Sequence, residues 1–323
     1  MTQTWLWIGF TAFILVMLAI DLGVLNRTAH VVTLKEAARW SVAVVIAAAI
    51  FDLFIFRERG SQAGLEFVTG YVIELALSVD NVFVFILIFN YFRVPAAFQH
   101  RVLFWGIFGA LALRGAMIGA GWLLIDRFEW IIYVFGAFLV VTGFRMAFSD
   151  HTDIEPEANP VLKVIRRFVK ITPRYEGEAF FTHTGTGMRM AVVATPLLVV
   201  LVLVDLEDLV FAVDSIPAIF AITRDPFLVF SSNAFAILCL RSMYFLLAGI
   251  IEKFRFLNYG LGAVLSFVGV KMLITYFHVE IPIVLSLGAV GGMLGSAVIV
   301  SLIFPQAPEA PPAQPIPPLE GTE

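Results

Sequence analysis

Long apolar segments separated by short polar ones make up most of this chain. A helix needs about 20 mainly apolar residues to cross the hydrocarbon core of a bilayer, and most of these segments approach or exceed that length. The pattern predicts an all-α polytopic membrane protein with about nine transmembrane helices. The predicted spans are residues 5–25, 41–56, 66–92, 102–125, 130–148, 191–222, 227–250, 257–277 and 281–304.

The composition supports this assignment and divides the chain into regions. Hydrophobic residues make up 60% and charged residues 14%, whereas a soluble domain has about a quarter charged residues. We predict a membrane domain over residues 1–304, containing one long polar loop at 149–190, and a Pro-rich, disordered tail at 305–323. The start of the chain lacks a basic region and a cleavage pattern, so we expect a retained first span.

Basic residues predict which side of the membrane each loop faces. If the N-terminus lies outside and the C-terminus in the cytoplasm, the outer loops hold only Arg57, Arg59, Arg127 and Arg224. The inner loops then hold thirteen basic residues: Arg27, Lys35, Arg39, Arg93, Arg101, Lys163, Arg166, Arg167, Lys170, Arg174, Arg189, Lys253 and Arg255. This excess of positive charge favours that orientation and a plasma-membrane location.

Two acidic segments inside predicted spans resemble each other. Residues 74–81 (ELALSVDN) align with residues 208–215 (DLVFAVDS), so an acid is followed six residues later by Asp and then by a small polar residue. An ionised carboxylate near the bilayer centre costs roughly 2.5–3.5 kcal/mol. A chain that places such groups twice in matched positions is expected to use their oxygens to hold a cation.

The similarity extends over three spans in each half. Leu113-Arg114 matches Leu240-Arg241, and the segment 143–146 (GFRM) matches 269–272 (GVKM). Spans three to five therefore resemble spans six to eight. Because each half has three helices, the halves must have opposite topology. Such inverted three-helix repeats are typical of secondary transporters, whose sites lie at the repeat interface.

Helical geometry separates the acids of each motif. Glu74, Ser78 and Asn81 share one face of an ideal helix, whereas Asp80 points about 120° away from Glu74. Likewise Asp208 and Ser215 share a face that excludes Asp214. We therefore predict that the helices unwind locally so that both acids of each pair reach one ion, with Pro217 freeing a carbonyl near Asp214.

The candidate ligands are hard oxygen donors suited to Mg²⁺, Ca²⁺ or Mn²⁺. The candidate metal site comprises Glu74, Asp80, Asn81, Asp208, Asp214 and Ser215, with Asp21, Asp205, Glu207, Arg114 and Arg241 as further site or pathway residues. A purely structural alternative is that Asp80 or Asp214 neutralises the intramembrane arginines. The histidines, including His100, lie close to predicted loops, where a solvated or interfacial position is expected.

Other chemistries find little support in the sequence. The single cysteine, Cys239, cannot form a disulfide within the chain or a Cys-rich metal site. Phosphate-binding loops, nucleophile elbows and His-Glu-x-x-His motifs are absent. We therefore expect a protein that is not an enzyme, has no cofactor and binds no nucleic acid.

The paired motifs resemble those of a known family. The segments 74–85 (ELALSVDNVFVF) and 208–223 (DLVFAVDSIPAIFAIT), together with Asp21-Leu22-Gly23, look like the signature of the TerC/Alx family of integral membrane proteins. That family is named for tellurium-resistance loci and is grouped with LysE-type exporters, and the resemblance implies Mn²⁺ efflux. This sequence departs from the family pattern at Glu207, where a Thr is expected, and the added charge bears on ion preference.

The leading hypothesis is a secondary transporter in a bacterial inner membrane that exports divalent cations, foremost Mn²⁺. Asp80 and Asp214 would be the central ligands, and an ion or proton gradient would supply the driving force. One alternative is a membrane scaffold in a metal or tellurite stress response, with the 149–190 loop or the tail binding protein partners. Another is an exporter of cationic amino acids. The oligomeric state stays open.

Overall fold

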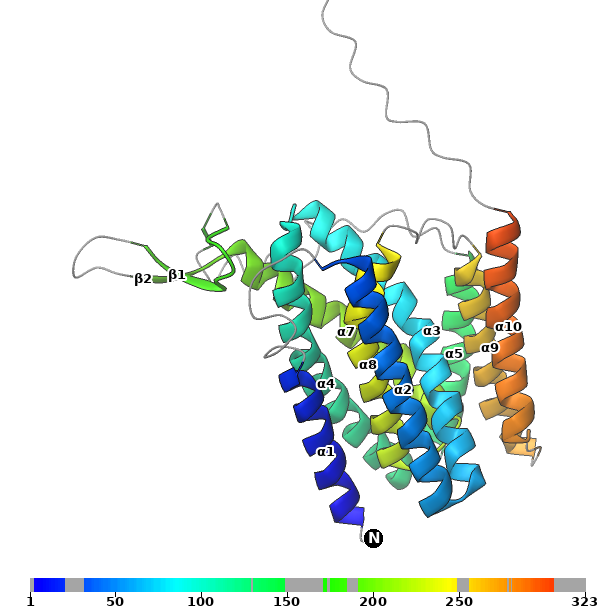
Figure 1. The fold of residues 1–323 in the computed structure, drawn as a ribbon. Coiled ribbons are helices and arrows are strands. Elements are labelled where there is room, and N and C mark those ends of the chain that lie inside the picture. Colours follow the sequence, from blue (N-terminus) through cyan, green and yellow to red (C-terminus); the bar gives the residue numbers. More distant parts are fainter. Residues whose placement is uncertain are drawn as a thin grey trace, which may run out of the picture.

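The computed structural model describes residues 3–20, 32–128, 130–148, 171–172, 175–184, 191–248, 256–277, 279 and 281–304. Within these ranges an α-helix lies at each of the nine predicted spans (Figure 1). The helices are α1 (Gln3–Ile20), α2 (Leu34–Arg59), α3 (Ser61–Tyr91), α4 (Ala96–Arg127), α5 (Ile131–Phe148), α7 (Pro196–Phe220), α8 (Pro226–Leu247), α9 (Leu257–Ile274) and α10 (Ile283–Ile303). A short 3-10 turn, η5 (Thr275–Phe277), follows α9.

Seven of the described helices are long and apolar enough to cross a bilayer, which makes the chain a polytopic, all-α membrane protein. The apolar part of α1, Thr4–Ile20, is slightly shorter. Helix α7 is long enough at 25 residues, but its sequence includes four acidic residues. In Figure 1, α1 starts at one end of the bundle and α10 finishes at the other.

Helix α2 begins seven residues before the predicted span because of a capping box. The Glu36 amide donates to Oγ1 of Thr33 at 3.3 Å, and the Thr33 amide donates to Oε2 of Glu36 at 2.8 Å. Two of the backbone donors that a helix start leaves unpaired are thereby satisfied. The first turns of α2 are polar, so an apolar pattern alone could not include them.

A short antiparallel hairpin is the exception to the all-α prediction. Strand β1 (Phe181–Thr184) pairs with β2 (Ala191–Ala194), and Figure 1 shows the hairpin projecting away from the helical bundle. The predicted span starting at residue 191 was therefore too long, since α7 begins only at Pro196. Proline suits the first position of a helix because that position needs no amide hydrogen.

Glycines bring α5 and α9 into backbone contact. A Cβ added at Gly143 would lie 2.5 Å from the carbonyl oxygen of Gly262, and one added at Gly262 would lie 2.5 Å from that of Gly143. Gly136 and Gly269 contact each other in the same reciprocal way. These pairings run in opposite chain directions, so the two helices are antiparallel. A two-fold axis between inverted repeats would produce such contacts, and the repeat itself stays a prediction.

Candidate functional site

Both acidic motifs lie in unbroken helix. Helix α3 continues through residues 74–81 and α7 through residues 208–215, with Pro217 inside the helix. The prediction of local unwinding is therefore wrong. The neighbouring helices supply the polar partners that a break in the backbone was expected to provide.

The predicted polar faces are confirmed by burial. Glu74, Ser78 and Asn81 are each buried on α3, and Asp208 and Ser215 are buried on α7. Glu74 is 1% exposed and Asp208 is 2% exposed. Since α3 packs against α7, the two faces bring acids from both motifs into the interior of the bundle.

Arg114 of α4 joins the two motifs. Its Nε donates to Oδ2 of Asp208 at 2.9 Å, and its Nη2 donates to Oδ1 at 2.7 Å, so the guanidinium binds this carboxylate with two hydrogen bonds. Its Nη1 forms an ion pair with Oε1 of Glu74 and donates to Oγ of Ser215 at 3.4 Å. The arginine is only 1% exposed. The structural alternative predicted that Arg114 would be neutralised by Asp80 or Asp214. In the structure Arg114 is paired with Glu74 and Asp208, two acids that were predicted to bind the ion.

Several buried oxygens beside this ion-pair cluster remain without a hydrogen-bond partner among the described residues. They are Oε2 of Glu74, Oγ of Ser78 and Oδ1 of Asn81. The amide nitrogen of Asn81 donates to Asp208 at 3.5 Å, which leaves its carbonyl oxygen available as an acceptor. Buried polar atoms in native proteins nearly always have a partner, so these α3 oxygens are candidates to coordinate a cation.

A small cavity adjoins these groups. Its volume is about 10 Å³ and its lining includes Glu74, Asn81, Arg114, Asp214 and Ser215. That is roughly the space one water molecule needs. The structure therefore brings five of the predicted site residues, together with the adjacent Asp208, around a space the size of a small ion.

The other predicted acids have different outcomes. The side chain of Asp80 and all of Asp21 lie outside the described residues. Among the side chains that are described, no group of three or more His, Cys, Asp or Glu residues has the arrangement of a metal site. A complete ligand cage around Asp80 and Asp214 thus stays a prediction. Glu207 is half-buried on α7 and is absent from the cavity lining described above.

Asp205 occupies a niche formed by glycines of α4. A Cβ atom added at Gly109 would lie 2.6 Å from Cγ of Asp205, and one at Gly106 would lie 3.5 Å from its Oδ1. The same Oδ1 is buried and has no hydrogen-bond partner among the described residues. A second small cavity of about 10 Å³ contacts both Asp205 and Asp208, so Asp205 lies close to the ion-pair cluster.

Replacing Gly109 with Ala is expected to destabilise the protein by about 1–3 kcal/mol, the usual range for overpacking. The added methyl group would overlap the Asp205 carboxylate. Thermal unfolding in detergent micelles measures the change. Gly119→Ala is the control on the same helix, because nothing lies within 4 Å of a Cβ there. Combining Gly109→Ala with Asp205→Ala should restore stability, and a failure to do so would contradict this account.

The second predicted arginine, Arg241 of α8, has a different partner. Its Nη1 lies 2.5 Å from Nε2 of His100, near the start of α4. His100 is half-buried in the first turns of α4, close to the preceding loop, which fits the interfacial position expected for it. Its ring lies against the buried Arg241 guanidinium. No local pattern could indicate this pair, because the two residues are 141 positions apart along the chain.

Comparison of the sequence with known proteins identifies related membrane proteins. The sequence profile of the integral membrane protein TerC family matches residues 59–309. An uncharacterized membrane protein of Myxococcus xanthus is 52% identical over 92% of both chains. An Escherichia coli protein with the provisional name "membrane-bound redox modulator Alx" is 47% identical, over 92% of this chain and 94% of its own. A Rickettsia bellii membrane protein is 37% identical over 92% of this chain and 97% of its own. No solved structure matches.

Proposed function

Because this chain belongs to the TerC family of integral membrane proteins, we propose that it exports divalent metal cations, foremost Mn²⁺, from the cytoplasm. The observation that carries the proposal is the meeting of Glu74 and Asp208, from two matched motifs, at one buried arginine. Ionisable residues inside membrane-spanning segments are rare and mark substrate, ion and proton pathways.

The charges of the cluster fit a divalent cation. When ionised, Glu74, Asp208 and Asp214 have three negative charges, and Arg114 has one positive charge. One divalent ion would neutralise the remaining charge of −2. The neutral oxygens of Asn81 and Ser215 lie at the same cavity, and mixed carboxylate and neutral oxygen donors suit Mn²⁺, Mg²⁺ and Ca²⁺.

Arg114 would allow the carrier to return to its starting conformation without a bound cation. Two buried carboxylates lacking a counter-charge would cost several kcal/mol, and the guanidinium offsets that cost in the structure described. An entering cation would compete with Arg114 for Glu74 and Asp208. The carrier would therefore have two low-energy states, one with the arginine paired and one with the metal bound. An ion or proton gradient would drive export.

The alternatives are less consistent with the site. A cavity of about 10 Å³ has room for about one water-sized occupant, whereas a cationic amino acid is several times larger. The name given to the Escherichia coli relative refers to redox modulation. A single cysteine in the full sequence excludes a dithiol–disulfide cycle within one chain. The proposed scaffold surfaces, the tail and most of the 149–190 loop, lie outside the described residues.

The test is manganese efflux in an exporter-deficient, manganese-sensitive strain. Wild type should lower cellular manganese, while Glu74→Gln, Asp208→Asn and Asp214→Asn should each reduce Mn²⁺ transport into inverted vesicles roughly tenfold or more. Loss of even outer-shell groups weakens metal sites by about 10–100-fold. All variants must reach equal membrane levels.

Asp126→Asn is the matched control, because Asp126 is an exposed acid at the end of α4. It should transport like wild type. If wild type leaves manganese unchanged, the exporter proposal fails. If wild type transports and the three cluster variants do so equally well, the assignment of the site fails while the function stands.

A further inference from the structure

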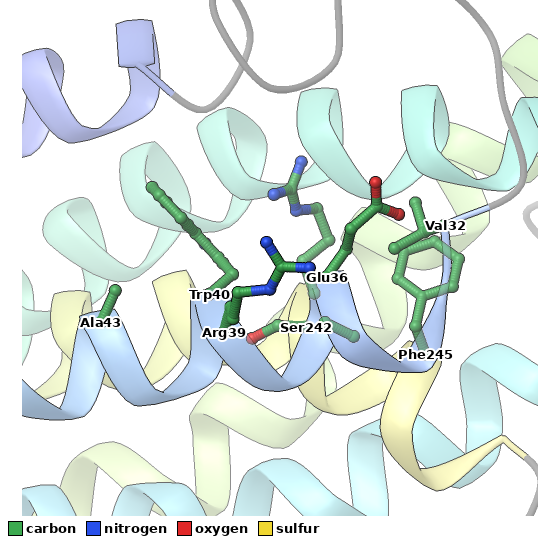
Figure 2. Close-up of a pocket in the computed structure, with 9 residues that line it drawn as sticks. Val32, Glu36, Arg39, Trp40, Ala43, Ser242 and Phe245 are labelled. Carbon is green, nitrogen blue, oxygen red and sulfur yellow. The ribbon is translucent and has the colours of Figure 1, made fainter.

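A second region of the protein forms a larger cavity, away from the ion-pair cluster. It has a volume of about 270 Å³ and lies between the first turns of α2 and the last turns of α8. Figure 2 shows the Arg39 and Glu36 side chains projecting from α2, with Phe245 of α8 beside Val32. Nothing in the proposed transport mechanism accounts for a cavity of this size.

The lining is amphipathic and has a positive net charge. Arg39 and Arg241 contribute two guanidinium groups and Glu36 one carboxylate, which leaves a formal charge of +1. Trp40 and Phe245 form aromatic walls on the same cavity. A ligand that fits has a negatively charged group for the arginines and an apolar part for the rings. Guanidinium is well suited to phosphate because it offers two parallel donors.

The walls of the cavity are held by polar contacts. Oγ of Ser41 on α2 donates to Oγ of Ser242 on α8 at 2.8 Å. The Thr33–Glu36 capping box fixes the start of α2, and Oε2 of Glu36 accepts hydrogen bonds from the amide and the hydroxyl of Thr33. The positive end of the α2 dipole lies at this same helix start and favours a nearby anion. The cavity is therefore preformed at the contact between α2 and α8.

Its depth in the membrane also favours a lipid. The lining residues on α2, together with Val32 just before it, span positions 32–43, which is about three helical turns from one end of the bundle. Trp40 and the arginines thus lie near a membrane–water boundary, where aromatic and basic side chains gather. The predicted sidedness makes this the cytoplasmic boundary. Basic pockets between transmembrane helices on that side bind anionic lipid headgroups.

We propose that the α2–α8 cavity binds the headgroup of an anionic phospholipid from the cytoplasmic leaflet, with the exposed Arg39 contacting its phosphate. Arg241, which also binds His100, contributes positive charge at the buried side of the cavity. Trp40 and Phe245 flank the first part of an acyl chain. Arg241 also lines the small cavity that contacts Asp205 and Asp208. One side chain therefore links the lipid site to the region of the acidic cluster.

The experiment compares purified full-length protein in nanodiscs containing phosphatidylcholine alone or with phosphatidylglycerol. Native mass spectrometry should show retained phosphatidylglycerol on wild type. Arg39→Gln should weaken that binding roughly fivefold, the contribution of one basic residue near an anionic membrane surface. Arg57→Gln is the control, because Arg57 is an exposed arginine at the opposite end of the same helix, and it should bind like wild type.

Thermal unfolding with added inorganic phosphate separates a lipid from a free anion. Phosphatidylglycerol should stabilise wild type more than it stabilises Arg39→Gln. Inorganic phosphate at the same concentration should not stabilise wild type to this extent. Equal phosphatidylglycerol binding by wild type and Arg39→Gln would overturn the proposal, as would equal stabilisation by phosphate alone. Lipid binding is measured without metal, so its failure leaves the transport proposal intact.

Discussion

Replacing Arg114 with Gln is expected to destabilise the folded protein by about 3–5 kcal/mol, the range for breaking a buried ion pair by removing one partner. The reason is that Glu74 and Asp208 would keep their buried positions without a counter-charge. Their exposed fractions of 1% and 2% leave little access to water. Thermal or SDS-induced unfolding in micelles measures the loss.

A second variant separates charge from packing. Arg114→Gln combined with Asp208→Asn should recover part of the lost stability, because one of the uncompensated charges is then removed. Arg145→Gln is the control, since Arg145 also lies in a predicted span but is exposed on α5. It should change stability by less than about 0.5 kcal/mol. If Arg114→Gln is equally mild, the ion-pair cluster does not stabilise the fold.

Gly143→Ala should have the other large effect, a loss of roughly 3 kcal/mol at the upper end of the overpacking range. The new methyl carbon would lie 2.5 Å from the carbonyl oxygen of Gly262 and 2.7 Å from the backbone nitrogen of Ser266. Backbone atoms cannot rotate away as a side chain does, so α5 and α9 would have to separate. Unfolding of the purified variant in micelles gives the measurement.

Gly291→Ala is the matched control for this contact. Gly291 is exposed within α10, and nothing lies within 4 Å of a Cβ at that position. Alanine is favoured over glycine inside a helix by about 0.5–1 kcal/mol, so this variant should be neutral or slightly stabilised. Opposite signs for the two substitutions would support backbone packing. Equal effects would show that the α5–α9 contact contributes little.

Within the described residues, the positions of the helices could be predicted from the sequence because a membrane span requires a long apolar run. The errors fall where that rule does not apply. The polar first turns of α2 depend on the Thr33–Glu36 capping box, and residues 191–194 are apolar but form a strand. An apolar segment of four residues has no periodicity that separates strand from helix.

The predicted site shows the same division. Helical spacing grouped Glu74 with Asn81 and Asp208 with Ser215, and the structure confirms both faces. The predicted unwinding was wrong because it assumed that each helix had to gather its own pair of acids. In the structure one acid from each helix meets Arg114 of a third helix.

What the sequence by itself determined is therefore where the long apolar helices of the described residues lie, and which face of α3 and α7 each motif residue occupies. The first follows from apolar runs and the second from helical periodicity. Only the tertiary structure decided which faces meet. Helix contacts depend on close approach between distant segments, as between Gly143 and Gly262 or between Asp205 and Gly109. The same packing brings Glu74 and Asp208 to Arg114, and Arg241 to His100. These partners lie far apart along the chain, so no local sequence pattern indicates that they meet.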